Sequence, residues 1–304
     1  MIYLNAHKAN ILRAKINHRD KLLDLLYQRI DNIEDEISIK LFDNLINNDL
    51  EKILIGNPAE LGQLSIQVLN VIGKNESVLK SLKYVFNYDW FIYKTVKRYS
   101  GYELASKLDV NTCTYCNRNY TNTVITRQGK KLIRPQFDHY FDKDSHPLLA
   151  LSFYNLIPSC SICNSSIKHK KEFKLETHPH PYFDDILGEF NFNFSFSNDP
   201  YYKSGLKIFI EVYRDWFTKN YLNDLEMEEV YSAHTDILYD LLLTKQAYSN
   251  RYLSILENTV LQGFHISRDE IYRLVFGVHL EQKDFQKRPF SKFKKDILEE
   301  LNII

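Results

Sequence analysis

The chain contains two short cysteine stretches, CTYC at residues 113–116 and CSIC at residues 160–163, and no cysteine elsewhere in its 304 residues. Two C-x-x-C turns can supply the four soft ligands that a tetrahedral zinc ion prefers. The alternative, two unrelated pairs of buried cysteines, is disfavoured by the identical spacings. Four thiolates leave no open coordination position, so we expect a structural zinc and not a catalytic one. The expected ligands are Cys113, Cys116, Cys160 and Cys163.

The whole chain has the composition of a globular protein, because 44% of its residues are hydrophobic, 26% are charged, and only 9 glycines and 8 prolines occur. The formal net charge is zero, so any nucleic-acid contact must come from a local basic patch. No run of about 18 apolar residues occurs, and the first residues lack the apolar core of a secretory signal. We therefore expect a cytoplasmic protein with no membrane partner.

The periodicity outside the cysteine region is helical. Leu22, Leu26 and Ile30 recur at helical spacing, and loops are expected at residues 57–58 and 73–75. The predicted fold class is mainly α with a small α+β insert. We expect a helical N-terminal region over residues 1–108, a zinc-stabilised module over residues 109–180, and a short β hairpin followed by a helical region over residues 181–304.

Strands are predicted in two places. Residues 121–126 and 132–137 favour strands around a turn at residues 128–130. A helix is expected to start after Cys163, because Asn164 and the next two serines offer capping oxygens. Phenylalanines alternate with Asn and Ser over residues 190–196, which predicts a half-buried strand with a partner at residues 206–212.

Polar residues that can perform chemistry lie close to the cysteine pairs. Asp138 and His139 follow the predicted returning strand, Asn155 comes later, and Asn164 directly follows Cys163. Taken alone, the Asp-His step is most simply an ordinary surface carboxylate and a satisfied histidine. The zinc turn, however, would hold Asn164 rigidly at the start of the next helix.

This order of residues resembles the four-cysteine HNH endonucleases of the ββα-metal fold, over about residues 113–174. Asn164 stands at the third motif position in place of a histidine. More loosely, the stretch LSFYNLIPSC at residues 151–160 and the helical flanks resemble the PtuB-type HNH subunits of bacterial anti-phage (Septu) systems. The resemblance implies an ABC/AAA-type, PtuA-like ATPase as protein partner, within a Septu or retron complex.

The resemblance also implies hydrolysis of phosphodiester bonds with one catalytic Mg²⁺ or Mn²⁺ ion. His139, neutral near its ordinary pKa of about 6.5, suits removal of a proton from the attacking water. Asp138 would supply one hard oxygen ligand and Asn164, by its match to the last motif position, a second. By the family match, Asn155 would orient the His139 ring and the loop that carries it.

Basic side chains flank the proposed site in the sequence. Any single lysine is most simply a solvated surface residue, but together they suggest contacts to phosphates. The predicted nucleic-acid contacts are Arg127, Lys130, Lys131, Arg134, Lys168, Lys170 and Lys171. A second basic run, between Lys287 and Lys295, is interpreted equally well as a DNA contact or as ordinary surface.

Some nearby residues have alternative interpretations. Asp142, Asp144 and His146 could approach the metal but are more simply loop residues, and His169 could replace Asn164, although its spacing fits less well. Three functions stay open at this level. The first is a metal-dependent HNH nuclease that acts on DNA. The others are a toxin-like nuclease that acts on RNA or tRNA, and a non-catalytic zinc-dependent module that binds nucleic acid or protein.

Overall fold

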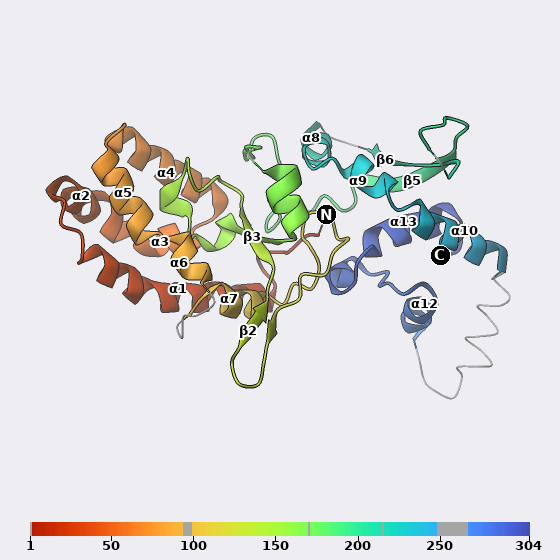
Figure 1. The fold of residues 1–304 in the computed structure, drawn as a ribbon, viewed down its shortest axis with the longest axis horizontal. Coiled ribbons are helices and arrows are strands. Elements are labelled where there is room, and N and C mark those ends of the chain that lie inside the picture. The colour runs from red at the N-terminus through yellow and green to blue at the C-terminus, as the bar shows by residue number, and fades with distance from the viewer. Residues whose placement is uncertain (1, 94–98, 170, 203, 214–215, 248–266) are drawn as a thin grey trace. The chain divides into compact units, whose positions relative to one another are not determined.

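The computed structural model describes residues 2–93, 99–169, 171–202, 204–213, 216–247 and 267–304 (Figure 1). The expected mainly α class is confirmed, and the strands of the described residues form three two-stranded antiparallel sheets. Among the helices described, none has both the length and the apolar character that a membrane crossing requires.

The chain divides into two compact units. The N-terminal unit comprises Leu4–Val110 and Thr121–Asp184, and the C-terminal unit comprises Met1–Tyr3, Asn111–Tyr120 and Asp185–Ile304. The expected boundaries at residues 108 and 180 stay predictions, since units defined by contacts need not follow sequence order.

Helices make up most of the N-terminal unit. In chain order they are α1 (Ala9–Ile30), α2 (Glu36–Leu41), α3 (Leu50–Ile55), α4 (Pro58–Ile72), α5 (Glu76–Val85), α6 (Tyr88–Ile92) and α7 (Gly101–Leu108). Two further helical turns, η1 (Phe42–Ile46) and η2 (Asn47–Asp49), precede α3. Leu22 and Leu26 of α1 are fully buried, which confirms the helical period of the sequence.

The loops that were expected at residues 57–58 and 73–75 are confirmed as helix boundaries. The Asn57 side chain accepts a hydrogen bond from the Glu60 backbone N–H at 3.0 Å, and the Glu60 carboxylate accepts the Asn57 N–H at 2.9 Å. This reciprocal cap starts α4. Gly73 ends α4 with a φ of 60°, a conformation that costs little only for glycine.

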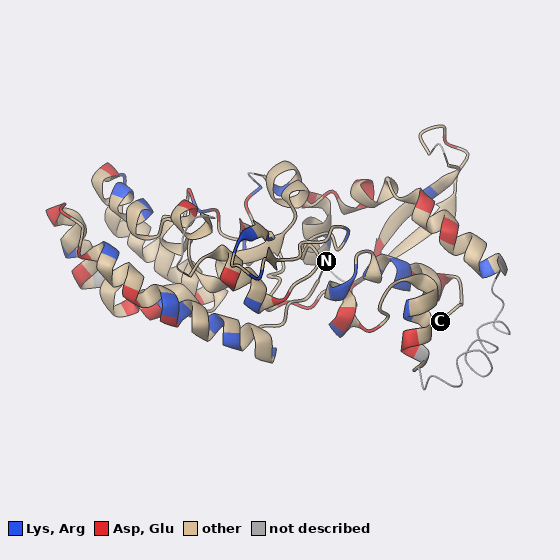
Figure 2. Cartoon of the chain, turned by 60° about the horizontal axis from the view of Figure 1, so that its bottom comes forward, with Lys and Arg blue, Asp and Glu red and all other residues tan. Residues whose placement is uncertain are grey.

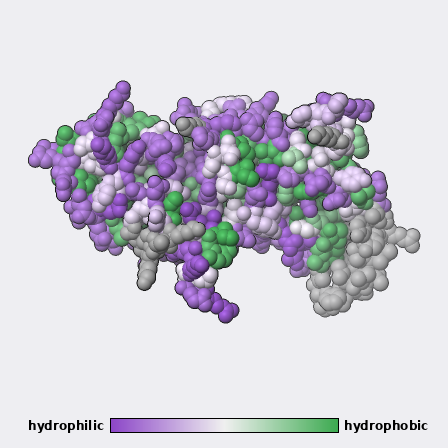
Figure 3. Space-filling view, viewed as in Figure 1, coloured by the Kyte–Doolittle hydropathy of each residue, from purple (hydrophilic) through white to green (hydrophobic). Residues whose placement is uncertain are grey.

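The predicted hairpin exists, but both of its strands are shorter than expected. Strands β1 (Val124–Ile125) and β2 (Lys131–Ile133) pair around a turn in which the Thr126 N–H donates to the Lys130 oxygen at 2.9 Å. The strand then breaks at Pro135, because proline has no N–H for a ladder. Figure 3 shows apolar side chains near the base of this hairpin and a hydrophilic tip.

The continuation after Pro135 forms a second sheet. Strand β3 (Gln136–His139) pairs antiparallel with β4 (Leu156–Ser159), so that Asp138 lies opposite Ile157 and His139 opposite Leu156. The turns η3 (Pro147–Leu149) and η4 (Phe153–Asn155) lie on the connection. A wide helix, η5 (Ile162–Lys168), follows β4, so the expected helix is present. Its expected start after Cys163 is wrong, because the helix already begins at Ile162 and has no side-chain cap, and the Asn164 side chain bonds to Gln136 instead. Two strands and a helix thus follow one another.

The C-terminal unit is built on the predicted phenylalanine strand. Strands β5 (Phe190–Phe196) and β6 (Leu206–Val212) pair antiparallel with the expected bounds. Phe190 and Phe192 are buried, whereas Phe196 is 78% exposed, so only one end of the stripe belongs to the core. The helical elements are α8 (Trp216–Asp224), α9 (Met227–Ser232), α10 (Thr235–Ala247), α12 (Arg268–Phe276), η8 (Gln282–Lys287) and α13 (Ser291–Glu300).

Candidate active site and metal centre

The four cysteines gather into one cluster. All four are buried, and their Sγ atoms all lie within 4.8 Å of one another. Zinc–sulfur bonds of about 2.3 Å in a tetrahedron place the sulfurs about 3.8 Å apart, so the cluster fits a zinc ion after small adjustments. A site that could bind zinc is therefore present at the four predicted ligands.

Each cysteine pair is held in a tight turn. The Arg118 N–H donates to the Cys116 Sγ at 3.4 Å, and the Cys163 N–H donates to the Cys160 Sγ at 3.5 Å. Such bonds stabilise a thiolate, which is the form that binds metal. The second turn continues directly into η5, because the Asn164 N–H donates to the Cys160 oxygen at 3.0 Å. The cysteine pair therefore fixes the position of Asn164.

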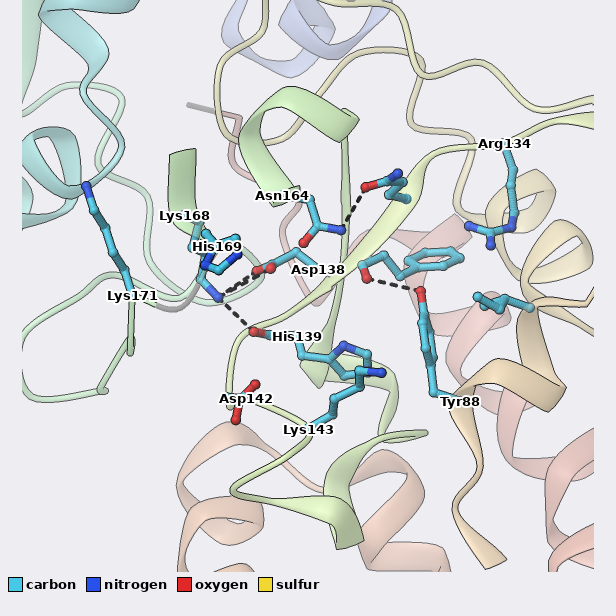
Figure 4. Close-up of a pocket in the computed structure, with 13 residues that line it drawn as sticks. Tyr88, Arg134, Asp138, His139, Asp142, Lys143, Asn164, Lys168, His169 and Lys171 are labelled. Atoms are coloured by element: carbon cyan, nitrogen blue, oxygen red, sulfur yellow. Dashed lines mark hydrogen bonds and ion pairs between the residues drawn. The ribbon is translucent and has the colours of Figure 1, made fainter. Parts of the chain in front are cut away.

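A pocket of about 340 Å³ lies beside β3 and η5. This volume corresponds to roughly ten water molecules. Figure 4 shows the predicted residues Asp138, His139 and Asn164 around it. The lining residues are Tyr88, Ile92, Arg134, Gln136, Phe137, Asp138, His139, Asp142, Lys143, Asn164, Lys168, His169 and Lys171.

Asp138 forms a buried ion pair with Lys168. The Lys168 Nζ lies 3.0 Å from Oδ2 and 3.3 Å from Oδ1 of Asp138, and it donates to the His139 backbone oxygen at 2.9 Å. The Lys168 and Asp138 side chains are 4% and 5% exposed. The η5 helix makes this contact possible, because Asn164 and Lys168 lie about one wide turn apart, with the His169 N–H bonded to the Asn164 oxygen at 3.1 Å.

The His139 ring is held from two sides. Its Nε2 lies 3.1 Å from the Ala150 backbone oxygen, which can only accept, so Nε2 carries the proton and Nδ1 keeps a lone pair. The Tyr88 ring meets the His139 ring edge-on, with the ring centroids 4.5 Å apart. Burial lowers the pKa of His139 to about 4, and the positive charges of Lys143 and Lys168 act in the same direction. The imidazole is therefore neutral near pH 7.

Tyr88 is a site residue that the sequence analysis did not find. Its hydroxyl donates to the Phe137 backbone oxygen at 3.1 Å, and burial raises its pKa to about 12. It begins α6, which is capped by the Asn87 side chain accepting the Trp90 N–H at 2.7 Å. Among 21 tyrosines, nothing in the local sequence distinguishes this one.

Asn155 positions the loop that follows His139. Its Oδ1 accepts the Phe141 N–H at 2.6 Å, and its Nδ2 donates to the oxygens of Phe141 at 3.1 Å and Leu149 at 2.9 Å. The residue is fully buried. The partner of the His139 ring is Ala150, directly after Leu149 in this loop, so Asn155 acts on the ring through the loop.

Asn164 is oriented by Gln136. The Asn164 Nδ2 donates to the Gln136 Oε1 at 2.9 Å, which turns the amide oxygen of Asn164 away from Gln136. Figure 4 shows this oxygen on the side of the pocket where Asp138 lies. Gln136, on β3, is a second residue that sequence reasoning missed.

The four residues that were considered as alternatives near the metal lie in different surroundings. Asp142 and His169 line the pocket, and the Asp142 carboxylate accepts the Ser145 N–H at 2.9 Å. Asp144 lies 3.9 Å from Lys83, and His146 bonds to the Ser65 hydroxyl at 2.9 Å.

The predicted phosphate contacts fall into three groups. Arg127 and Lys130 are exposed on the hairpin, whereas Arg134, Lys168 and Lys171 line the pocket. Lys131 is 3.0 Å from Glu103, and its side chain is only 8% exposed. Lys170 lies outside the described residues.

The second basic run has internal partners. Lys287 pairs with Asp284 at 2.8 Å, the Arg288 guanidinium donates to the Gly277 oxygen at 3.0 Å, and Lys292 pairs with Asp296. These contacts favour its interpretation as ordinary structure.

The charge of the pocket is mostly positive. Arg134, Lys143, Lys168 and Lys171 are set against two carboxylates, while the ring of His139 is neutral. Figure 2 shows Lys and Arg in blue and Asp and Glu in red, distributed along the chain. An anion would therefore be attracted here, although the chain as a whole has no net charge.

Comparison of the chain with protein-family models, with curated protein sequences and with solved structures finds no match.

Proposed function

We propose that this chain is a divalent-metal-dependent endonuclease of the HNH type that hydrolyses phosphodiester bonds of DNA. The observation that carries the proposal is the convergence of Asp138, His139 and Asn164 on one cationic pocket. Asp138 and His139 lie on β3 and Asn164 lies on η5, and β4, which pairs with β3, comes between these two elements in the chain. The same order of elements is what the HNH resemblance implies.

His139 is the proposed general base. Because Nε2 donates to Ala150, the lone pair of Nδ1 can take a proton from an attacking water. The lowered pKa keeps the ring unprotonated at neutral pH, which this role requires. Tyr88 and the loop held by Asn155 restrict the ring to one orientation.

The donor set fits a magnesium or manganese ion. The Asp138 carboxylate and the Asn164 amide oxygen are hard oxygen donors, and Mg²⁺ in proteins is commonly held by one or two side chains together with water and phosphate. When bound, the ion would supply positive charge that stabilises the leaving oxygen. Arg134, Lys143 and Lys171 would bind the phosphates of the substrate.

A partner is proposed from the sequence resemblance. The helical parts of the chain would dock an ABC/AAA-type ATPase of the PtuA-like kind, and the complex would act in anti-phage defence of the Septu or retron type. Co-purification of this chain with the product of a neighbouring ATPase gene tests this proposal, and purification of the chain free of any such ATPase would contradict it.

The nuclease proposal is tested with a supercoiled plasmid, with the chain alone and with its co-purified partner. We expect cleavage with Mg²⁺ or Mn²⁺ and none with excess chelator. His139→Ala should lower the rate by about 10²- to 10⁴-fold, the usual contribution of general base catalysis, without loss of the fold. The exposed His7 provides the matched control, since His7→Ala removes a histidine far from the pocket residues in sequence.

Three results would contradict the proposal. These are cleavage that persists in folded His139→Ala, cleavage that survives chelation, and no cleavage under either condition. A parallel digestion of total RNA decides the substrate: faster loss of RNA than of plasmid would replace DNA by RNA.

The choice between Asn164 and His169 as the last motif residue is tested by separate alanine variants. We expect Asn164→Ala to abolish cleavage more completely than His169→Ala. The reverse order would transfer the role to His169.

A further inference from the structure

The buried Lys168–Asp138 pair bears directly on how a metal ion could reach the proposed site. Both Asp138 oxygens lie within 3.3 Å of the Lys168 ammonium. A Mg²⁺ ion would have to approach the same carboxylate to about 2.1 Å. Because the ammonium and the ion both carry positive charge, their repulsion in a buried site opposes binding of both to this carboxylate.

Lys168 cannot simply leave. Its ammonium also donates to the His139 oxygen at 2.9 Å and lies 4.8 Å from the centre of the Phe173 ring. A buried ammonium without an anionic partner is strongly unfavourable, so displacement by a metal ion requires a new anion for Lys168. The pocket supplies access for one, since Lys168 is among its lining residues.

A phosphodiester is the anion that the pocket favours. Arg134, Lys143 and Lys171 line the same pocket, so the phosphates of a nucleic-acid strand there would meet several cations. The excess of positive charge also disfavours a free divalent ion in the absence of an anion. Nucleic acid would therefore remove both obstacles to metal binding, the Lys168 ammonium at Asp138 and the excess positive charge of the pocket.

Resting on the proposed function, we infer that Lys168 is a counter-ion that keeps the divalent ion from Asp138 until a nucleic-acid phosphate enters the pocket. The phosphate forms an ion pair with the Lys168 ammonium in place of Asp138, and the Asp138 carboxylate can then bind the metal ion. Metal and nucleic acid then bind cooperatively, and each raises the affinity for the other by the same factor. Free metal in the cell would not load the site without substrate.

The test measures Mn²⁺ binding by electron paramagnetic resonance in the full chain carrying His139→Ala, with zinc retained. Titrations are done with and without a short DNA duplex, and duplex alone is subtracted. We expect the duplex to raise the Mn²⁺ affinity at least tenfold. In the double variant with Lys168→Met, the affinity without DNA should already be at least tenfold higher, and the added effect of DNA should fall below threefold.

Two controls separate this position from general charge. Lys171→Met removes a positive charge from the same pocket and should change the DNA-free Mn²⁺ affinity by less than threefold. Lys168→Arg keeps the charge and should keep the Mn²⁺ affinity low without DNA. Circular dichroism and zinc content report whether each variant is folded. The effect of DNA on the Mn²⁺ affinity of the protein with Lys168 intact is a test that needs no lysine variant.

The outcomes distinguish the two proposals. Asp138-dependent Mn²⁺ binding that is equally tight with and without DNA, and unchanged in Lys168→Met, overturns the counter-ion inference and leaves the nuclease proposal standing. Mn²⁺ binding that Asp138→Asn does not affect in any condition overturns both.

Discussion

Two buried lysine–aspartate pairs, one in each unit, have the same chemistry and different surroundings. In the C-terminal unit, the Lys292 ammonium lies 2.7 Å from Asp296 and donates to the Phe190 backbone oxygen at 2.8 Å. Asp296 in turn accepts the Phe192 N–H at 3.0 Å. Both partners belong to α13, and the pair ties this helix to β5. Its polar atoms are enclosed by the fold.

The Lys168–Asp138 pair is equally buried but borders a pocket. Its partners come from η5 and β3, and the neighbouring side chains include His139 and Asn164. Asp138 can therefore exchange its lysine for a ligand that enters from the pocket, while Asp296 has no comparable alternative among the contacts described. The surroundings, more than the burial, therefore decide whether a lysine–aspartate pair can exchange its partner for a ligand.

The largest loss of stability is expected at the cysteine cluster, and it exceeds the losses expected at the two lysine–aspartate pairs. Cys163→Ser should release the zinc and lower the free energy of unfolding by an amount on the order of 10 kcal/mol, because metal binding and folding are coupled. Metal analysis and denaturant unfolding measure the two effects. Ser161→Ala, an exposed change in the same turn, is the control. Full zinc content in folded Cys163→Ser would contradict the site.

The second largest loss of stability is expected at the Lys292–Asp296 pair. Lys292→Met leaves Asp296 buried without its cation and should lower the free energy of unfolding by about 3–5 kcal/mol. Adding Asp296→Leu should recover most of this loss, since an apolar pair of similar volume needs no charge partner. Urea unfolding measures both. A loss below about 1 kcal/mol in the single variant would remove the distinction between the two pairs.

The buried His18 shows how much burial alone changes stability, because the two groups that its ring bonds to are neutral. His18 of α1 bonds to the Leu151 oxygen at 2.7 Å and the Tyr99 hydroxyl at 3.1 Å, and burial lowers its pKa to about 4. The unfolded chain takes up this proton below about pH 6.5 and the folded chain only near pH 4. Stability from His18 is therefore complete above about pH 6.5 and is lost as the pH falls through 4.

The expected loss from His18 amounts to about 3 kcal/mol between pH 6.5 and 4. Urea unfolding across this range measures it, and the His18→Gln variant should show a flatter dependence than the unsubstituted chain. An unchanged slope in His18→Gln would show that other groups carry the pH dependence.

The smallest effect is expected at the pair that borders the pocket. Lys168→Met should lower the free energy of unfolding by only about 1–2 kcal/mol, because water or a cation from the pocket can replace the ammonium at Asp138. The measurement is urea unfolding beside Lys292→Met under the same conditions. Equal losses in the two variants would show that the pocket does not relieve Asp138.

Several features of the molecule follow from local sequence. The alternation of Phe190 to Phe196 predicts β5 with its bounds, because the two-residue period of a strand needs no distant partner to be visible. The cysteine spacing predicts the cluster for a similar reason, since each C-x-x-C is a complete turn. Asp138, His139 and Asn164 share a pocket as the motif spacing suggests.

Other features were not predictable from local sequence. The strand expected over residues 132–137 is interrupted at Pro135, and its second part pairs with β4 instead of β1. Lys168 and Lys131 look like surface lysines in the sequence, yet they are paired with Asp138 and Glu103. Tyr88 comes from α6, about 50 residues before His139, and no pattern links the two.

The helical class, the two cysteine turns and the kinds of polar residue beside them could all be inferred from the sequence. These depend on periodicity and on short-range spacing, which the chain displays before it folds. The tertiary structure alone decided which charges neutralise one another, which nitrogen of His139 keeps its lone pair, and which carboxylate borders a pocket. Those properties depend on distances of a few ångströms between residues far apart in the chain, and on water being excluded around them.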